Sequence, residues 1–226
     1  MGRFFEILID WSEVWALFIP LSMLMFRRNQ PEAMKPVVIY LFLALFVNLL
    51  IDLMLPIGRY LPEELRSNNP LYNIHSIIRF VCFSVYFIRM PDSSFLAVKK
   101  TLVMLSVAFL VINFGFFEQF FNFDSFSGNL LSIEAYLLLI FCMFYYLSEL
   151  KEDDKNLFDS PHFWVVTGLS VYVVVNFFVF LFYIPMLKVD VRLAINIWNV
   201  HNVAFIIFCL FLTKAFYGTT RYQFAN

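Results

Sequence analysis

The stretch that decides the fold is Leu71–Phe80, LYNIHSIIRF, which places a histidine and an arginine in a segment that is otherwise apolar enough to cross a membrane. Its polar members are Tyr72, His75, Ser76 and Arg79. At about 100° per residue they fall within an arc of roughly 100°, so one helix face is polar and the rest is apolar. A charge near the bilayer centre costs between about 2.5 and more than 10 kcal/mol. We therefore expect this face to point into a helix bundle.

The composition of the whole chain indicates an integral membrane protein. Its 226 residues are 62% hydrophobic and include 31 Phe, and the mean hydropathy is +0.77, whereas soluble domains are about 45–50% apolar. Seven segments reach the roughly 20 apolar residues that a spanning helix needs. They are residues 4–26, 36–57, 70–90, 99–121, 129–149, 161–186 and 190–216. We predict an all-α protein in which residues 1–226 form one domain, a bundle of seven transmembrane helices.

The positions of Lys and Arg predict how this bundle is oriented, because cytoplasmic loops are enriched in positive residues. One side carries ten of them: Arg27, Arg28, Lys35, Arg89, Lys99, Lys100, Lys151, Lys155, Lys214 and Arg221. The other side carries five: Arg3, Arg59, Arg66, Lys188 and Arg192. We expect a multi-pass protein of the cell inner membrane, with the N-terminus outside and the C-terminus in the cytoplasm.

Charge and cysteine usage narrow the choice of partners. The net charge is −1 and no basic patch is present, which argues against nucleic acid as a partner. The lipid bilayer is the expected surrounding. Cys82, Cys142 and Cys209 all lie inside apolar runs, so we interpret them as small buried hydrophobic side chains rather than as disulfide partners.

With this orientation, the ionisable residues inside the membrane all lie in the outer half. At about 1.5 Å per residue they form a layer on the order of 7–17 Å below the outer surface. The layer contains Asp10, Glu13, Asp52, His75, Arg79, Glu134 and His201. We predict a polar cavity at this depth, and the candidate ligand-binding residues are Glu13, Asp52, Tyr72, His75, Arg79, Glu134, Asn199, His201 and Asn202.

Acids outnumber cations in this layer. Five acids, Glu6, Asp10, Glu13, Asp52 and Glu134, accompany Arg79 and two histidines. Two or three carboxylates are thus expected to lack a partner, and each must be protonated, solvated or neutralised by a bound cation. The layer then binds a metal or an amine-bearing ligand, relays protons, or is a water-filled vestibule. Interhelical hydrogen bonds that merely hold the bundle together are the structural alternative.

A catalytic metal is the sharpest of these hypotheses. The candidate ligands are His75, His201, Glu13 and Asp52, because nitrogen and oxygen ligands with an open position suit a divalent cofactor such as zinc. The seven-span zinc hydrolases, such as the alkaline ceramidases and adiponectin receptors, use three histidines, two of them one turn apart on the last span. Here His201 has no such neighbour, and His162 is expected at the cytoplasmic interface. Whether the protein is an enzyme stays open.

Three stretches suggest a resemblance: LYNIHSIIRF at residues 71–80, PHFWVVTGLSVYVVVNFFVFLF at residues 161–182 and IWNVHNVAFIIFCLFLTKAF at residues 197–216. With them the chain resembles an uncharacterised family of bacterial seven-span integral membrane proteins of about this length. The resemblance implies a stand-alone membrane protein that works beside a signalling partner such as a sensor kinase. It implies no catalytic residues.

The leading functional hypothesis is a receptor-like or sensor protein. It would bind a small polar or cationic ligand in the outward cavity and pass a helix shift to a membrane partner. The alternatives are an intramembrane zinc hydrolase acting on a lipid and a small-molecule or proton-coupled transporter.

Overall fold

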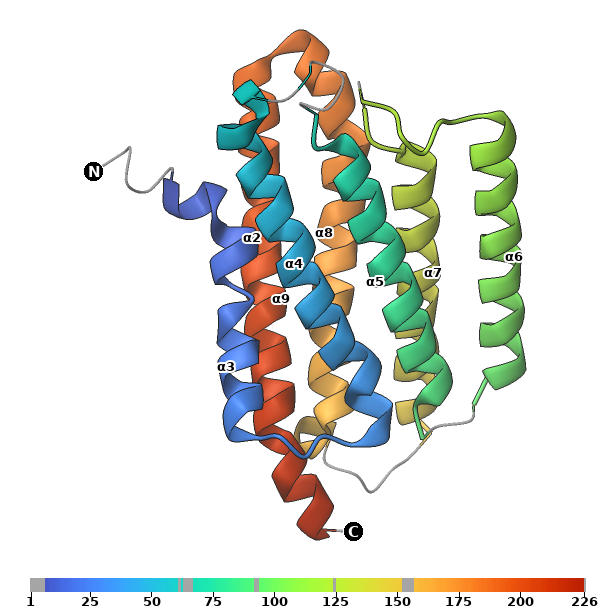
Figure 1. The fold of residues 1–226 in the computed structure, drawn as a ribbon. Helices are drawn as coiled ribbons and strands as arrows, with labels where there is room; N and C mark the ends of the chain where they lie inside the picture. Colours follow the sequence, from blue (N-terminus) through green and yellow to red (C-terminus); the bar gives the residue numbers. More distant parts are fainter. Residues whose placement is uncertain are drawn as a thin grey trace.

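The computed structural model describes residues 7–60, 62, 67–91, 94–123, 125–151 and 157–225, and its regular structure in these ranges is entirely helical. Six helices are long and apolar enough to cross a membrane, which confirms the all-α class and supports a membrane protein. They are α4 (Lys35–Ile57), α5 (Asn69–Arg89), α6 (Leu96–Phe116), α7 (Gly128–Glu149), α8 (Pro161–Val189) and α9 (Val191–Ala225) (Figure 1). Short 3₁₀ turns lie at Glu32–Met34, Gly58–Tyr60 and Leu157–Asp159.

The first predicted span, residues 4–26, differs from the expectation of one continuous helix. The chain forms a short helix α2 (Ser12–Trp15), breaks, and continues as α3 (Phe18–Phe26). Pro20 accounts for the break, because proline has no amide N–H and its ring clashes with the carbonyl four residues earlier, that of Ala16. The Ala16 carbonyl instead accepts from the Ile19 amide at 3.2 Å. Residues 4–6, including Glu6, lie outside the described residues.

Prolines and a capping serine set several helix starts. Pro36, Pro70 and Pro161 each occupy the first turn of their helices, where a missing N–H costs nothing. Ser127 caps α7, and its hydroxyl accepts a hydrogen bond from the Leu130 amide at 3.0 Å. Six of the predicted spans begin within three residues of the observed helices, and these local signals mark four of those starts.

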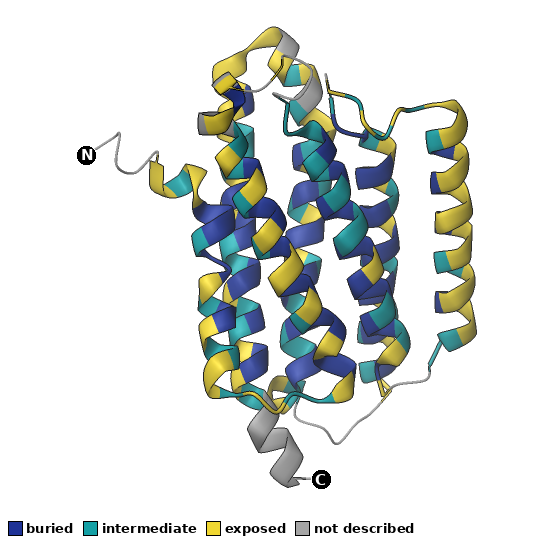
Figure 2. Cartoon of the chain, viewed as in Figure 1, coloured by how far each residue is buried: buried dark blue, intermediate teal, exposed yellow. Residues whose placement is uncertain are grey.

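The helices run alternately up and down, and all except α6 form a ring (Figure 1). Around this ring α4 packs on α5, α5 on α7, α7 on α8, α8 on α9, and α9 on α2 and α3. Helix α2 closes the ring against α4. Helix α6 lies outside, and Figure 2 shows exposed residues along most of it. Its exposed side chains include Met104 and Val111, as expected for a face that meets lipid.

The closest helix packing joins α8 to α9. A Cβ added at Gly168 would lie 2.5 Å from the Phe211 Cβ, so only glycine permits this approach. Small residues at such contacts are a general device of membrane helix pairs. The long α8–α9 hairpin forms one wall of the bundle, from which Tyr172, Asn176 and His201 reach the polar interior.

Candidate functional site

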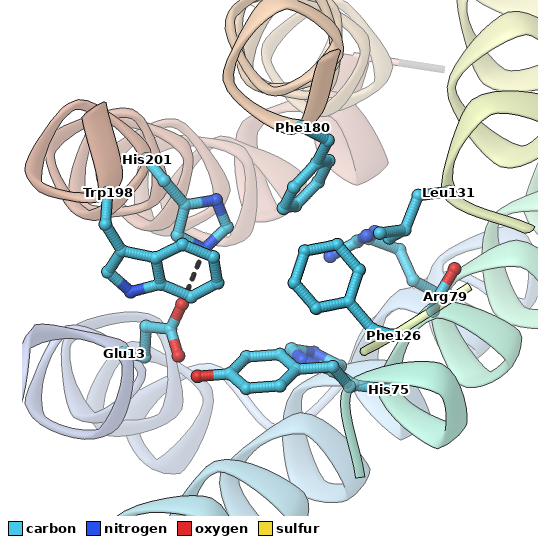
Figure 3. Close-up of a pocket in the computed structure, with 10 residues that line it drawn as sticks. Glu13, His75, Arg79, Phe126, Leu131, Phe180, Trp198 and His201 are labelled. Carbon is cyan, nitrogen blue, oxygen red and sulfur yellow. Dashed lines mark hydrogen bonds and ion pairs between the residues drawn. The ribbon is translucent and has the colours of Figure 1, made fainter. Parts of the chain in front are cut away.

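The predicted polar layer lies at one end of the bundle, where α4 leads to α5, α6 to α7 and α8 to α9 (Figure 1). We call this end the vestibule end, after the large cavity that opens there. Glu13, His75, Arg79 and His201 line one small cavity there (Figure 3). The structure thus brings together residues from α2, α5 and α9 that lie far apart in the sequence.

The first element of the site is an ion pair between Arg79 of α5 and Glu134 of α7. Arg79 Nε donates to one carboxylate oxygen, and Nη2 donates to the other at 3.0 Å. Ser76 Oγ donates to Glu134 as well. Both charged side chains are buried, and this two-pronged geometry is the strongest pairing that a guanidinium makes with a carboxylate. Glu134 is consequently neutralised within the protein.

The second element is a chain of hydrogen bonds through His201. Its Nε2 meets Glu13 Oε1, and its Nδ1 meets Asn176 Oδ1. Asn176 Nδ2 donates to the Tyr172 carbonyl at 2.8 Å, so its Oδ1 is the acceptor that faces the ring. Because both ring nitrogens face oxygen acceptors, the Glu13–His201 unit holds two protons and is neutral overall, whichever side of their contact carries the shared proton. His201 is therefore the partner of Glu13.

Tyr172 of α8 connects the two elements. Its hydroxyl accepts a hydrogen bond from Arg79 Nη1 at 2.8 Å, and the guanidinium carbon lies 5.1 Å from its ring centroid. The same ring packs against His201 with 5.8 Å between centroids. Sequence reasoning missed Tyr172 because it lies in an apolar run. Its spacing of four residues from Asn176, which puts both on one face of α8, was the signal available.

His75 takes a different position from the other basic residues. Its ring stacks on Tyr40 of α4 with 6.1 Å between centroids. Its Nε2 is buried without a hydrogen-bond partner among the described residues. The small cavity that it lines has a volume of about 20 Å³, which is room for one water molecule.

A larger cavity of about 680 Å³ opens above the small one, and we call it the vestibule. The described residues that line it are Asp10, Asn68, Asn69, Tyr72, Ser125, Phe126, Tyr183, Leu187, Ile195, Trp198 and Asn199. Among them only Asp10 is charged. Tyr72, Phe126 and Trp198 also line the small cavity, so these three aromatic side chains separate the two spaces.

The α6–α7 connection holds Phe126 in this position. Ser127 donates its amide to Asn73 Oδ1 at 2.8 Å, and Asn73 Nδ2 donates to the Phe120 carbonyl at 2.8 Å. Glu118 accepts from Asn113 Nδ2 at 2.9 Å and from the Ser127 hydroxyl. These bonds also explain why α6 ends at Phe116, before the predicted residue 121: the chain turns back so that Glu118 can cap the start of α7.

The remaining predicted residues are placed as follows. Asn199 and Tyr72 line the vestibule. Asn202 is buried and donates to the Ile9 carbonyl at 3.2 Å, which satisfies backbone in the interrupted first segment. Asp52 lines neither cavity and is half-buried, with Oδ2 unpartnered among the described residues. Among the four of these five acids that the structure describes, the unpaired ones are therefore Asp52 and Asp10, which is exposed.

The proposed metal ligands are not gathered into one set. Within the described ranges no three His, Cys, Asp or Glu side chains come close enough to hold a metal ion. Glu13 and His201 bind each other, whereas His75 stacks on Tyr40 and Asp52 lies elsewhere. His162, at the far end of α8, shares a hydrogen bond of 2.9 Å with the Tyr86 hydroxyl. The three cysteines are free and buried, as predicted.

The described residues form a helical bundle with six helices long and apolar enough to cross a membrane, and a buried polar network lies beneath an open vestibule. The chain matches no family model, and searches of curated proteins and of solved structures return no match.

Proposed function

We propose that the protein is a receptor-like membrane protein that binds a small cationic ligand in the vestibule. The proposal rests chiefly on one observation: among the described residues that line the vestibule, Asp10 is the one with a charged side chain, and the others are aromatic, amide, hydroxyl or aliphatic. Tyr72, Tyr183 and Trp198 form an aromatic cluster there, with centroid distances of 5.4 Å and 4.8 Å from Trp198. Aromatic faces beside a carboxylate are a common recognition site for ammonium groups.

The neutral network below the vestibule supports the same assignment. Because Glu134 pairs with Arg79 and Glu13 with His201, neither deeper acid needs an external cation. The Asp10 carboxylate is then the described acid available to balance the positive charge of a ligand in the vestibule. Trp198 packs on His201 with 5.0 Å between centroids, so a ligand that moves Trp198 acts directly on the α9 face that contacts α2.

The proposal includes a topology and an output. Residues 7–26 would make the first of seven crossings, with the vestibule outside a bacterial inner membrane, in accord with the bias of Lys and Arg toward the opposite side. A ligand shifts a conformational equilibrium only by binding its two states differently. The shift would pass to a separate membrane partner, such as a sensor kinase.

Choline and its neutral isostere 3,3-dimethylbutan-1-ol provide a matched pair of probes. Purified wild-type protein should bind choline more tightly, as measured by calorimetry, whereas Asp10→Asn should lose the discrimination, up to roughly fivefold for an exposed ion pair. Trp198→Leu should weaken choline binding roughly 2- to 30-fold, the range for one cation–π contact.

Glu32→Gln is the matched control, because Glu32 is an exposed acid at the opposite end of the bundle. It should leave choline binding unchanged. Equal preference for choline in wild type and Asp10→Asn would refute a cationic-ligand site at the vestibule.

Proton-coupled transport is a second candidate, favoured by the shared proton of the Glu13–His201 unit directly beneath the vestibule. In proteoliposomes containing a pH dye, an outward choline gradient should then drive proton movement that Glu13→Gln abolishes. Absence of choline-dependent proton movement in the wild type would eliminate this candidate and leave the receptor proposal intact.

A further inference from the structure

A third cavity lies at the end of the bundle opposite the vestibule, between α3 and α4. It is a groove of about 420 Å³, within the range of small-molecule sites. It exists because α3 packs on α9, while the helix that packs on α4 is α2. Figure 1 shows α3 and α4 drawing apart toward this end, where residues 27–31 connect them. The break at Ala16 and Leu17 thus leaves a groove between α3 and α4 at the far end of α3.

The walls of the groove are apolar and open sideways. Leu24 and Val38 line its inner part, and Ile39 and Phe42 line its outer part. Ile39 is 53% exposed and Phe42 is 59% exposed. In a membrane this opening faces the hydrocarbon of the surrounding leaflet, so the natural occupant of the walls is an acyl chain.

The rim of the groove is polar and positively charged. Arg28 and Lys35 both line it. Arg28 makes no ion pair with another described residue, whereas Lys35 pairs with Glu32 at 2.5 Å in an exposed i, i+3 pair. Such a solvent-screened pair is weak, and an ammonium has three donors to share. The rim can therefore bind an anion without breaking an interior contact.

Gln30 also lines the groove, and its amide group is already placed within the protein. Its amide nitrogen Nε2 donates a hydrogen bond to the Arg27 carbonyl at 2.8 Å. Its Oε1 is buried and has no donor among the described residues. Because this oxygen has almost no accessible surface, the groove offers Arg28 and Lys35, rather than Gln30 Oε1, to a headgroup.

We propose that this groove binds one anionic phospholipid of the phosphatidylglycerol type. The phosphate lies between Arg28 and Lys35, and an acyl chain follows Leu24 and Phe42 along the groove. Basic residues next to a membrane each contribute about fivefold to the binding of an anionic lipid. The site is separate from the vestibule and does not depend on the function proposed for it.

The test compares two lipids with identical acyl chains, dioleoylphosphatidylglycerol and dioleoylphosphatidylcholine, titrated into the full-length protein in detergent. Native mass spectrometry should show one phosphatidylglycerol retained at least fivefold more tightly than phosphatidylcholine. Arg28→Gln with Lys35→Gln should remove this preference. Ile39→Trp, which fills the groove, should reduce retention of both lipids.

Lys100→Gln and Leu53→Trp are the matched controls, since both residues are exposed and lie outside the groove. They should leave the lipid preference unchanged, and circular dichroism checks that every variant is folded. Equal retention of the two lipids, or a preference that survives Arg28→Gln with Lys35→Gln, would overturn the proposal. Binding of glycerol phosphate alone with the same affinity would also overturn it, because the groove would then be a free-anion site. A dimer whose interface covers the groove would overturn it as well.

Discussion

Replacing Arg79 with methionine tests whether the buried ion pair carries the organisation of the polar layer. Methionine keeps much of the apolar stem but removes the guanidinium, so Glu134 loses two hydrogen bonds and its counter-charge. The Tyr172 hydroxyl loses its donor at the same time. Glu134 is only 2% exposed, and water cannot reach it to compensate.

The magnitude follows from this burial. Removing one partner of a buried ion pair costs about 3–5 kcal/mol, whereas replacing both partners with apolar residues is often neutral or stabilising. For a chain of this size, about 1 kcal/mol shifts the thermal midpoint by roughly 2–4 °C. We expect Arg79→Met to lower the midpoint by roughly 6–20 °C, and Arg79→Met with Glu134→Leu to recover most of the loss.

Thermal unfolding in detergent, followed by circular dichroism, measures both variants. Arg89→Met is the control, because Arg89 is exposed at the end of the same helix, and it should shift the midpoint little. A double variant that is as unstable as Arg79→Met would show that the guanidinium is needed for something other than neutralising Glu134, and would refute the reasoning.

Three further predictions concern the packing and topology. Gly168→Ala should destabilise the protein by about 1–3 kcal/mol through overpacking against α9, whereas Gly115→Ala, which has nothing within 4 Å of its new Cβ, should be neutral or stabilising in the same thermal assay. Asn202→Ala should cost about 0.6–1.7 kcal/mol and should increase hydrogen exchange in residues 7–10, since its amide bonds a carbonyl of that segment. In Ser125→Cys the new thiol should react with a membrane-impermeant maleimide in intact cells, whereas in Phe158→Cys it should react only after permeabilisation. The native cysteines are buried and should not contribute to the labelling. The opposite labelling pattern would reverse the proposed topology.

Much of the fold is local in origin and is therefore readable from the sequence. Apolar runs of spanning length, with proline in the first turn of three of them, locate α4 to α9 closely. The first segment departs from this because hydropathy registers the apolar length of residues 4–26 but not the effect of Pro20 on the carbonyl of Ala16.

The polar face of α5 is likewise determined by sequence alone, since the spacing of Tyr72, His75, Ser76 and Arg79 fixes their common side on any helix. Which acid neutralises which cation is decided only in three dimensions. Arg79 and Glu134 are 55 residues apart, and Glu13 and His201 are 188 apart. Helical periodicity carries no information over such separations, because the pairing depends on which helices become neighbours. The contacts between these helices pair Glu134 with Arg79 and Glu13 with His201. They leave Asp10 as the charged side chain that faces the vestibule in the part of the chain that the structure describes.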